Sequence, residues 1–525
     1  MRTVLLSLLA LALTAGAWSQ NTMTHVGTWE GEGPADYFGG SMTCGDFNGD
    51  GYEDMLIGAG GWANDVGKNY LYLGGPTWPI IPFLTIQGTY DNERYDWSNA
   101  NLGDFNGDGW DDFAIPAQKW VYDHQAKVDV FFGGDLLDTL PDWTYWAPMV
   151  SSPFEWLVDS CGDVNGDGGK DLIVLESAFF AGDMDTIRLF WGGAALDTAP
   201  DWIYIVHDVD VASIHGAGDV NGDEFSDLLF RGSNGPTRIF FGGSPMDTIP
   251  DVVIPFTTYG NHPGTPVRDF NGDGYDDIAL CKYFTGITYP RDVVYFGGAD
   301  MDTVPDLWLL NWDEDSSRSV DAMTCGDFNG DGYGDLAGTG GESGYAAVRI
   351  WLGGPHPTAQ CDATIYGNTW LDFGYSLGTG DLDGDGCDEL LIAEKAWDFN
   401  PEGTVYLFDG PETWIDYGDT SAVAPHELQR HPGWFALAQN YPNPFNAATT
   451  IHFDLGKPSN VSLTLYDLTG QRIKNLIDNK SMMPGGYNVS WMGKNDSGAP
   501  VASGMYLLEL QVDQYRQTKK VILMK

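Results

Sequence analysis

Short apolar runs separated by turns rich in Gly, Asn and Asp occupy most of the chain. Runs such as MLIGA at 55–59, FAIPA at 113–117 and LIVLE at 172–176 are typical of buried strands. Each is followed by a second strand-like run that ends in an apolar residue or pair and a tight turn. These endings are YLGG at 72–75, FFGG at 131–134, FWGG at 190–193, FFGG at 240–243, YFGG at 295–298, WLGG at 351–354 and FDG at 408–410. The pattern predicts an all-β fold.

A nine-residue motif precedes each of these pairs of strands and occurs seven times. The copies start at Asp46, Asp104, Asp163, Asp219, Asp269, Asp327 and Asp381, with spacings of 50 to 59 residues. They are DFNGDGYED, DFNGDGWDD, DVNGDGGKD, DVNGDEFSD, DFNGDGYDD, DFNGDGYGD and DLDGDGCDE. Repetition at such a period is typical of an architecture built from equivalent units.

The motif places oxygen-bearing side chains at positions one, three, five and nine. A hard cation such as calcium binds six to eight oxygens, and alternate residues of a tightly curled loop can direct theirs to one centre. Position seven varies freely, as expected where only a main-chain carbonyl is used. We therefore predict up to seven structural calcium ions. The candidate ligands are Asp46, Asn48, Asp50, Tyr52 and Asp54; Asp104, Asn106, Asp108, Trp110 and Asp112; Asp163, Asn165, Asp167, Gly169 and Asp171; Asp219, Asn221, Asp223, Phe225 and Asp227; Asp269, Asn271, Asp273, Tyr275 and Asp277; Asp327, Asn329, Asp331, Tyr333 and Asp335; and Asp381, Asp383, Asp385, Cys387 and Glu389.

The motif differs from an EF-hand loop, and one of its seven copies differs from the others. An EF-hand loop would continue to a Glu at position twelve between helices, whereas here position nine runs directly into an apolar strand, so we expect a loop that closes a β-hairpin. Position six is Gly, which permits a sharp turn, except in the fourth copy, where Glu224 replaces it. The fourth site is therefore the one we expect to be weakest.

Four strands for each repeat predict seven blades of a β-propeller. A strand-like segment, HVGTWEGE at 25–32, precedes the first loop, and no further ring strand follows the seventh FDG. We expect this N-terminal strand to complete the last blade, because the ring then has no open edge. The predicted propeller covers residues 22–415, and residues 416–433 form a linker.

The loop motif and the strand that follows it, as in LIGA at 56–59, resemble the FG-GAP repeats of the N-terminal propeller of integrin α-chains. The resemblance spans roughly residues 22–415. It implies a binding role rather than catalysis. The integrin comparison goes no further, because the sequence shows neither an inserted metal-dependent adhesion domain nor a transmembrane helix.

Residues 434–525 carry a different set of alternating runs, separated by Gly, Pro and Asn, which predicts an immunoglobulin-like β-sandwich. NYPNPFN at 440–446, VSLTLYDLTGQRI at 461–473 and ASGMYLLEL at 502–510 resemble the type A sorting domain of the type IX secretion system. The resemblance implies a Gram-negative host, export by that machinery, and a secreted or outer-membrane surface location. An ordinary sandwich module of another kind shares much of the pattern and remains an alternative.

The N-terminal segment and the net charge indicate where the protein is located and which partners are excluded. Residues 1–20 have the basic start, apolar run and small residues of a signal peptide. The formal net charge of −50 excludes nucleic acid as a natural partner. No later run is long enough for a transmembrane helix, so we expect any membrane attachment to come from something else.

The expected ligand face is the one opposite the predicted calcium loops, because its connections vary in length and are rich in aromatic residues. We predict a glycan or protein ligand there and no enzymatic activity, since no motif of a known catalytic type occurs. A polysaccharide hydrolase or lyase with a carboxylate site on the propeller, and a structural scaffold of a surface layer, remain alternatives. The aromatic candidates are Trp62, Tyr90, Tyr95, Trp97, Trp120, Tyr122, Trp156, Phe179, Tyr283, Tyr289, Trp370 and Trp397.

Overall fold

The computed structural model describes the chain between residues 23 and 523, with gaps. The undescribed segments are 1–22, 34–35, 80, 91–92, 96–97, 118–125, 148–153, 179–183, 208–210, 233–234, 256–263, 283–290, 310–321, 343–344, 368–372, 395–402, 411–434, 438–444, 447, 456–458, 467–471, 484, 497, 503, 513–514 and 524–525.

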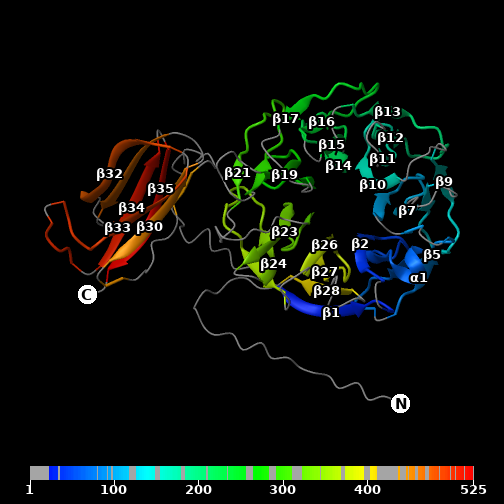
Figure 1. Ribbon diagram of the computed structural model, residues 1–525, viewed down its shortest axis with the longest axis horizontal. Coiled ribbons are helices and arrows are strands. Elements are labelled where there is room, and N and C mark those ends of the chain that lie inside the picture. The colour runs from blue at the N-terminus through cyan, green and yellow to red at the C-terminus, as the bar shows by residue number, and fades with distance from the viewer. Residues whose placement is uncertain are drawn as a thin grey trace, which may run out of the picture.

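The described residues between Thr24 and Asp409 form seven four-stranded antiparallel sheets arranged as the blades of a propeller around a common centre (Figure 1). Six blades take four consecutive strands each, and their first strands lie nearest the centre. The blades are β2 (Phe38–Gly45), β3 (Asp54–Ala59), β4 (Lys68–Tyr72) and β5 (Leu84–Gln87); β6 (Ala100–Gly103), β7 (Asp112–Ala117), β8 (Lys127–Phe131) and β9 (Trp143–Trp146); β10 (Phe154–Gly162), β11 (Asp171–Ala178), β12 (Thr186–Phe190) and β13 (Trp202–Ile205); β14 (Val211–Gly218), β15 (Asp227–Gly232), β16 (Thr237–Phe240) and β17 (Val252–Ile254); β18 (Gly264–Val267), β19 (Asp277–Lys282), β20 (Arg291–Tyr295) and β21 (Leu307–Trp308); and β22 (Met323–Gly326), β23 (Asp335–Glu342), β24 (Tyr345–Trp351) and β25 (Ala363–Tyr366).

The seventh blade confirms the predicted closure. Its inner strands are β26 (Phe373–Gly380), β27 (Glu389–Glu394) and β28 (Thr404–Asp409), and its outermost strand is β1 (Thr24–Glu30) from the N-terminus. β1 pairs antiparallel with β28, so residues nearly 380 positions apart share one sheet. The propeller therefore closes by exchange of one strand between its two ends.

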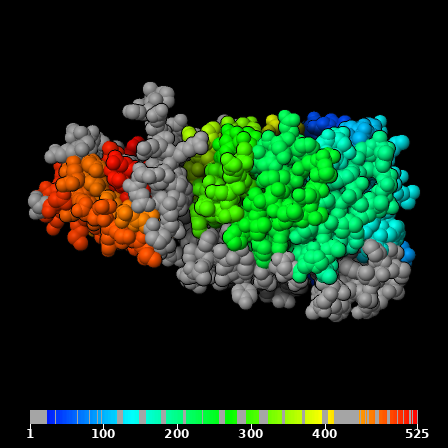
Figure 2. All heavy atoms as spheres, turned by 90° about the horizontal axis from the view of Figure 1, so that it is seen from above, coloured from blue at the N-terminus to red at the C-terminus, as the bar shows by residue number. Residues whose placement is uncertain are grey.

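The hydrophobic core of the ring is divided among the junctions between blades. Each of seven buried clusters combines side chains from two neighbouring blades, including the pair formed by the first and the last. Strands such as β3 and β27 are buried at every position because they have a blade on each side, which explains their continuous apolar runs. Figure 2 shows the ring edge-on as a squat disc.

A short helix, α1 (Trp62–Asp65), joins β3 to β4. The described residues include no helix long and apolar enough to cross a membrane.

The C-terminal region forms two antiparallel sheets that share one core. One sheet has the order β29–β30–β33, and the other has the order β32–β31–β34–β35. Trp491, Phe453 and Leu463 are among the buried side chains between them. The immunoglobulin type and the domain boundaries at 415, 433 and 434 stay predictions. The strands are β29 (Phe435–Leu437), β30 (Thr449–Leu455), β31 (Ser459–Tyr466), β32 (Arg472–Met482), β33 (Gly485–Trp491), β34 (Gly504–Val512) and β35 (Tyr515–Leu523).

Candidate metal loops

All seven nine-residue motifs form the same closed loop between the first and second strands of a blade, as the sequence predicted. The carboxylate at position one accepts a hydrogen bond from the main-chain N–H of position six in every loop, at 2.8–3.1 Å. The carboxylate at position five accepts one from the N–H of position seven, at 2.8–3.2 Å. These bonds curl the loop and hold both carboxylates on its inner side.

Position three lies against position five. In six loops the Asn at position three donates from Nδ2 to the position-five carboxylate, at 2.9–3.1 Å. The seventh loop has Asp383 instead, and one carboxylate oxygen each of Asp381, Asp383 and Asp385 lie within 4.8 Å of one another. Burial and the neighbouring Asp385 raise the pKa of Asp383, as expected for like charges held together.

The side chain at position nine lies beneath the loop and is fully buried in all seven copies. In six loops its carboxylate accepts a hydrogen bond from the main-chain N–H of position two. In six loops it also accepts one from the N–H of the first Gly in the turn between strands three and four. Burial raises the pKa of Asp54 to about 7, of Asp277 to about 8 and of Glu389 to about 9. In each loop the carboxylates at positions one and five, or at one and three, add to the shift. Such a group is costly as an anion unless a cation lies beside it.

The donor set fits a hard divalent cation. It consists of carboxylate and amide oxygens, the ligands that calcium prefers. Buried oxygens without a hydrogen-bond partner occur within the loops: Asp54 Oδ2, Asn271 Oδ1 and Glu389 Oε1. The residues that would hold the ion are those at positions one, three, five and nine, with the carbonyl of position seven.

The fourth loop keeps the shared conformation in spite of Glu224. Its N–H donates to Asp219 at 2.9 Å, as Gly does at this position elsewhere, and its φ is 73°. A Cβ added to Gly168, the equivalent residue of the third loop, would meet no atom within 4 Å, so the cost at Glu224 comes from the backbone alone.

Replacing this residue tests that cost. We expect Glu224→Gly to raise the free energy of unfolding by about 1 kcal/mol, because Gly adopts a positive φ without strain. The matched change Gly168→Ala should lower it by a similar amount. Chemical denaturation measures both, and a destabilised Glu224→Gly variant would contradict the argument.

Main-chain hydrogen bonds connect each loop to the loop before it in the ring. In six loops the N–H of position eight donates to the position-one carbonyl of the preceding loop, as from Glu53 to Asp381 at 3.0 Å and from Asp388 to Asp327 at 2.8 Å. In the first six blades the second Gly of the turn between strands three and four donates to the position-two carbonyl of the preceding loop, as from Gly75 to Leu382 at 2.8 Å. The hydrogen bonds donated by Glu53 and Gly75 join the first blade to the seventh, across the junction where the ring closes.

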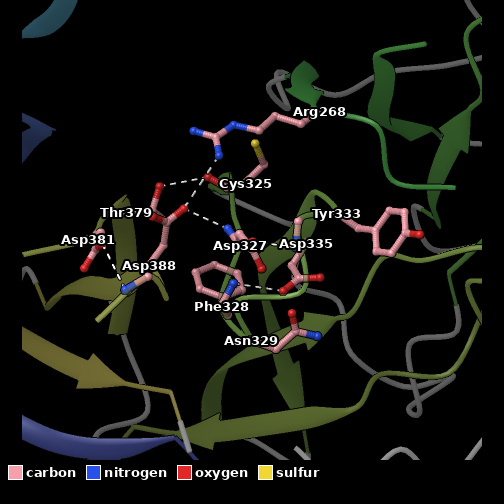
Figure 3. Close-up of polar contacts among 12 residues, drawn as sticks. Arg268, Cys325, Asp327, Phe328, Asn329, Tyr333, Asp335, Thr379, Asp381 and Asp388 are labelled. Atoms are coloured by element: carbon pink, nitrogen blue, oxygen red, sulfur yellow. Dashed lines mark hydrogen bonds and ion pairs between the residues drawn. The ribbon is translucent and has the colours of Figure 1, made fainter. Parts of the chain in front are cut away.

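The side chain at position seven has a role that the sequence analysis missed. In five loops a ring at position seven lies where a Cβ on the position-four Gly of the preceding loop would be, so Tyr275 covers Gly222 and Tyr333 covers Gly272. Figure 3 shows Tyr333 directed away from Asp327 and Asn329. Position seven thus varies under a packing constraint, although only its main-chain carbonyl is predicted to bind the ion. The aromatic residues at position seven of most copies are the feature of the sequence that could have indicated this packing.

One matched pair of glycines tests this packing. Gly222 and Gly107 have nearly the same φ, 79° and 81°, so an Ala carries a similar backbone cost at both. An Ala at Gly222 would overlap the Tyr275 ring, whereas the nearest atom at Gly107 is 3.6 Å away because Gly169 occupies position seven of the next loop. We expect Gly222→Ala to lower the free energy of unfolding by about 1–3 kcal/mol more than Gly107→Ala. Equal losses in a denaturant titration would refute the packing role.

Acidic side chains at position eight gather near the inner strands, where a catalytic carboxylate pair would lie. Burial raises the pKa of Glu53 to about 7, and Asp388 and Asp111 contribute. Asp388 accepts the Asp327 N–H at 2.7 Å, and Arg268 lies 4.0 Å from the same carboxylate (Figure 3). Asp388 thus links two neighbouring loops, as Asp111 does by accepting the Asp46 N–H at 3.3 Å.

The aromatic residues expected on the opposite face are mostly outside the described residues. Trp62 is half-buried and donates to Glu32 at 3.1 Å, Tyr90 is 47% exposed, and Tyr95 is buried with its hydroxyl on Asp129 at 2.6 Å. Tyr95 is therefore a packing residue. Nothing is described of the side chains of Trp97, Trp120, Tyr122, Trp156, Phe179, Tyr283, Tyr289, Trp370 and Trp397.

One pocket among the described residues lies on the loop face. It has a volume of about 360 Å³ beside the second loop, between Trp110 and the turn that joins β8 to β9. Leu136, Leu140 and Asp138 line it.

Comparison with known proteins identifies both regions. The FG-GAP repeat matches residues 38–73 and 373–408, which include the first and seventh loops, and the secretion system C-terminal sorting domain matches residues 439–524. Integrin alpha-5 of Xenopus laevis is 34% identical over 159 residues, which are 28% of this chain and 15% of that protein. Integrin alpha-8 of Homo sapiens is 32% identical over 179 residues, which are 32% and 17%. The chain thus spans less than a fifth of the length of these relatives.

A solved structure, BBS1N in complex with ARL6DN, soaked with mercury, covers 75% of the chain and 98% of its own at a TM-score of 0.48 and 11% identity. The loops and the repeat matches define the class: an integrin-α-like FG-GAP β-propeller. The particular chain joins this propeller to a type IX sorting domain.

Proposed function

We propose that this protein is an exported calcium-binding propeller that acts as a non-enzymatic binding or adhesion module for a glycan or a protein. The observation that carries the proposal is the set of seven closed loops, each with a buried carboxylate at position nine, a partly buried one at position one and an exposed one at position five. Bound calcium would neutralise these charges and rigidify every blade at one face. The ion would supply only structural order, and the residues named above would hold it.

The binding role rests on the resemblance of the repeats to those of integrin α-chains and on the rigid ring. The sorting domain supports export to the cell surface or beyond it through the type IX machinery, and outer-membrane placement belongs to the proposal. A glycan or protein ligand on the face opposite the loops is likewise proposed.

A metal count on the full chain tests the calcium sites. Dialysis against millimolar calcium and elemental analysis should give six or seven ions for each chain. Asp273→Asn, which changes position five of the fifth loop, should remove one ion or weaken one site at least tenfold. Asp300→Asn, an exposed acid outside the loops, is the matched control and should change neither. A chain without bound calcium would refute the proposal.

A second experiment separates the binding module from the enzyme. The calcium-loaded chain is applied to arrays of bacterial and host glycans and to matrix proteins, and bound polysaccharides are analysed for new reducing or unsaturated ends. Binding without product supports the module, whereas product formation supports a hydrolase or lyase.

A further inference from the structure

The first and seventh loops each leave one oxygen of the buried position-nine carboxylate without a hydrogen-bond partner. In loops two to six, one oxygen accepts the N–H of position two and the other accepts that of the first Gly in the turn between strands three and four. In the first loop Asp54 accepts the Gly74 N–H, but its Oδ2 has no partner. In the seventh loop Glu389 accepts the Leu382 N–H, but its Oε1 has none.

Both of these side chains are 0% exposed, so bulk solvent does not supply the missing donor. A buried carboxylate oxygen without a donor is costly unless a cation binds it. The two loops that need an ion for this reason are neighbours in the ring, on either side of the junction where the first blade meets the seventh (Figure 1).

The seventh loop also carries one carboxylate more than the other six. Asp383 stands at position three, where the other copies have Asn. One carboxylate oxygen each of Asp381, Asp383 and Asp385 lie within 4.8 Å of one another, and Glu389 lies beneath the same loop. The number of charged ligands is one of the factors that set the calcium affinity of an oxygen site. We therefore expect the seventh site to be the strongest when filled and its loop to be the most strained by repulsion when empty.

The shape of the seventh loop is coupled to the closure of the ring. The main-chain bonds from Glu53 and Gly75 of the first blade end on its residues at positions one and two. The side chain of Leu382, at position two, is 1% exposed and belongs to the core cluster that contains Trp29 of β1 and Tyr72 of the first blade. A loop distorted by unbalanced charge would therefore disturb the packing that β1 completes.

We propose that calcium bound in the seventh loop closes the ring, because it holds this loop in the shape against which the first blade and β1 pack. Without the ion, the junction between the first and seventh blades opens before the others. The inference rests on the proposed function, since it requires that the loops bind calcium, and it goes further by assigning a conformational step to one site.

Hydrogen exchange of the full chain in buffers of defined free calcium tests the proposal. In chelator, below the melting temperature, amides of β1 and β28 should exchange at least about tenfold faster than in saturating calcium. Amides of β15 and β16, in the fourth blade, should change less. The protection of β1 and β28 should return along a single binding curve as free calcium rises.

Two matched variants assign this curve to the seventh loop. Asp383→Asn gives that loop the amide of the other six, so about ten times more free calcium should be needed to protect β1 and β28. Saturating calcium should restore their protection, which separates a weakened site from a misfolded chain. Asn106→Asp adds a carboxylate at position three of the second loop, and the calcium midpoint for β1 and β28 should stay within about twofold of the native value.

The proposal is overturned if β1 and β28 respond to calcium no more than β15 and β16, or if the two variants share one midpoint. Elemental analysis of each sample gives the bound calcium. A chain that binds no calcium contradicts the proposed function itself, whereas a chain that binds calcium without protecting β1 and β28 contradicts only the role of the seventh loop.

Discussion

Removal of calcium with an excess of chelator should lower the melting temperature of the propeller by about 20 °C or more. Each site contributes about 2.7 kcal/mol when free calcium is about a hundredfold above its dissociation constant, and seven sites act on one ring. The buried carboxylates at position nine make the effect large, because without an ion they remain beside the acids of positions one, three or five. Differential scanning calorimetry of the full chain measures it.

The C-terminal sandwich provides the control within the same molecule. Its core, which includes Trp491 and Leu463, contains none of the proposed ligands. Its transition should stay in place when chelator is added. If the propeller transition also stays in place, the loops are not structural calcium sites. Addition of calcium should restore the original melting temperature of the propeller. A lowered melting temperature that persists would indicate irreversible unfolding.

Trp29→Ala should open the ring at its closing blade and lower the free energy of unfolding by about 3–5 kcal/mol. Trp29 is 6% exposed, packs edge-on against Tyr72 of the first blade at 6.0 Å, and donates its indole N–H to the Pro79 carbonyl at 2.8 Å. It thus joins the N-terminal strand of the seventh blade to the first blade. Its loss leaves a cavity and an unpaired carbonyl beside the one blade whose outermost strand comes from the other end of the chain.

The control for this variant is Glu30→Ala, which changes the exposed neighbour on β1. It should shift stability by less than about 0.5 kcal/mol. Hydrogen exchange gives a second measurement, because amides of β28 should lose protection first in Trp29→Ala. Equal stability of the two variants would show that β1 contributes little to closure.

The sequence alone was sufficient to predict the features that depend on the spacing of residues within one repeat. The nine-residue motif determined the loop, because its hydrogen bonds join residues two to seven positions apart. The strands around each loop followed from apolar runs between turn residues. The N-terminal strand could be placed because an open blade edge is unfavourable and only one segment remained to cover it.

Tertiary structure decided what depends on contacts between repeats. The covering of Gly222 by Tyr275 joins residues more than fifty positions apart, and spacing within the motif contains no sign of it. The complete burial of position nine also depends on residues outside the motif, since in six blades the first Gly of the turn between strands three and four, 15 to 21 positions away, donates to its carboxylate.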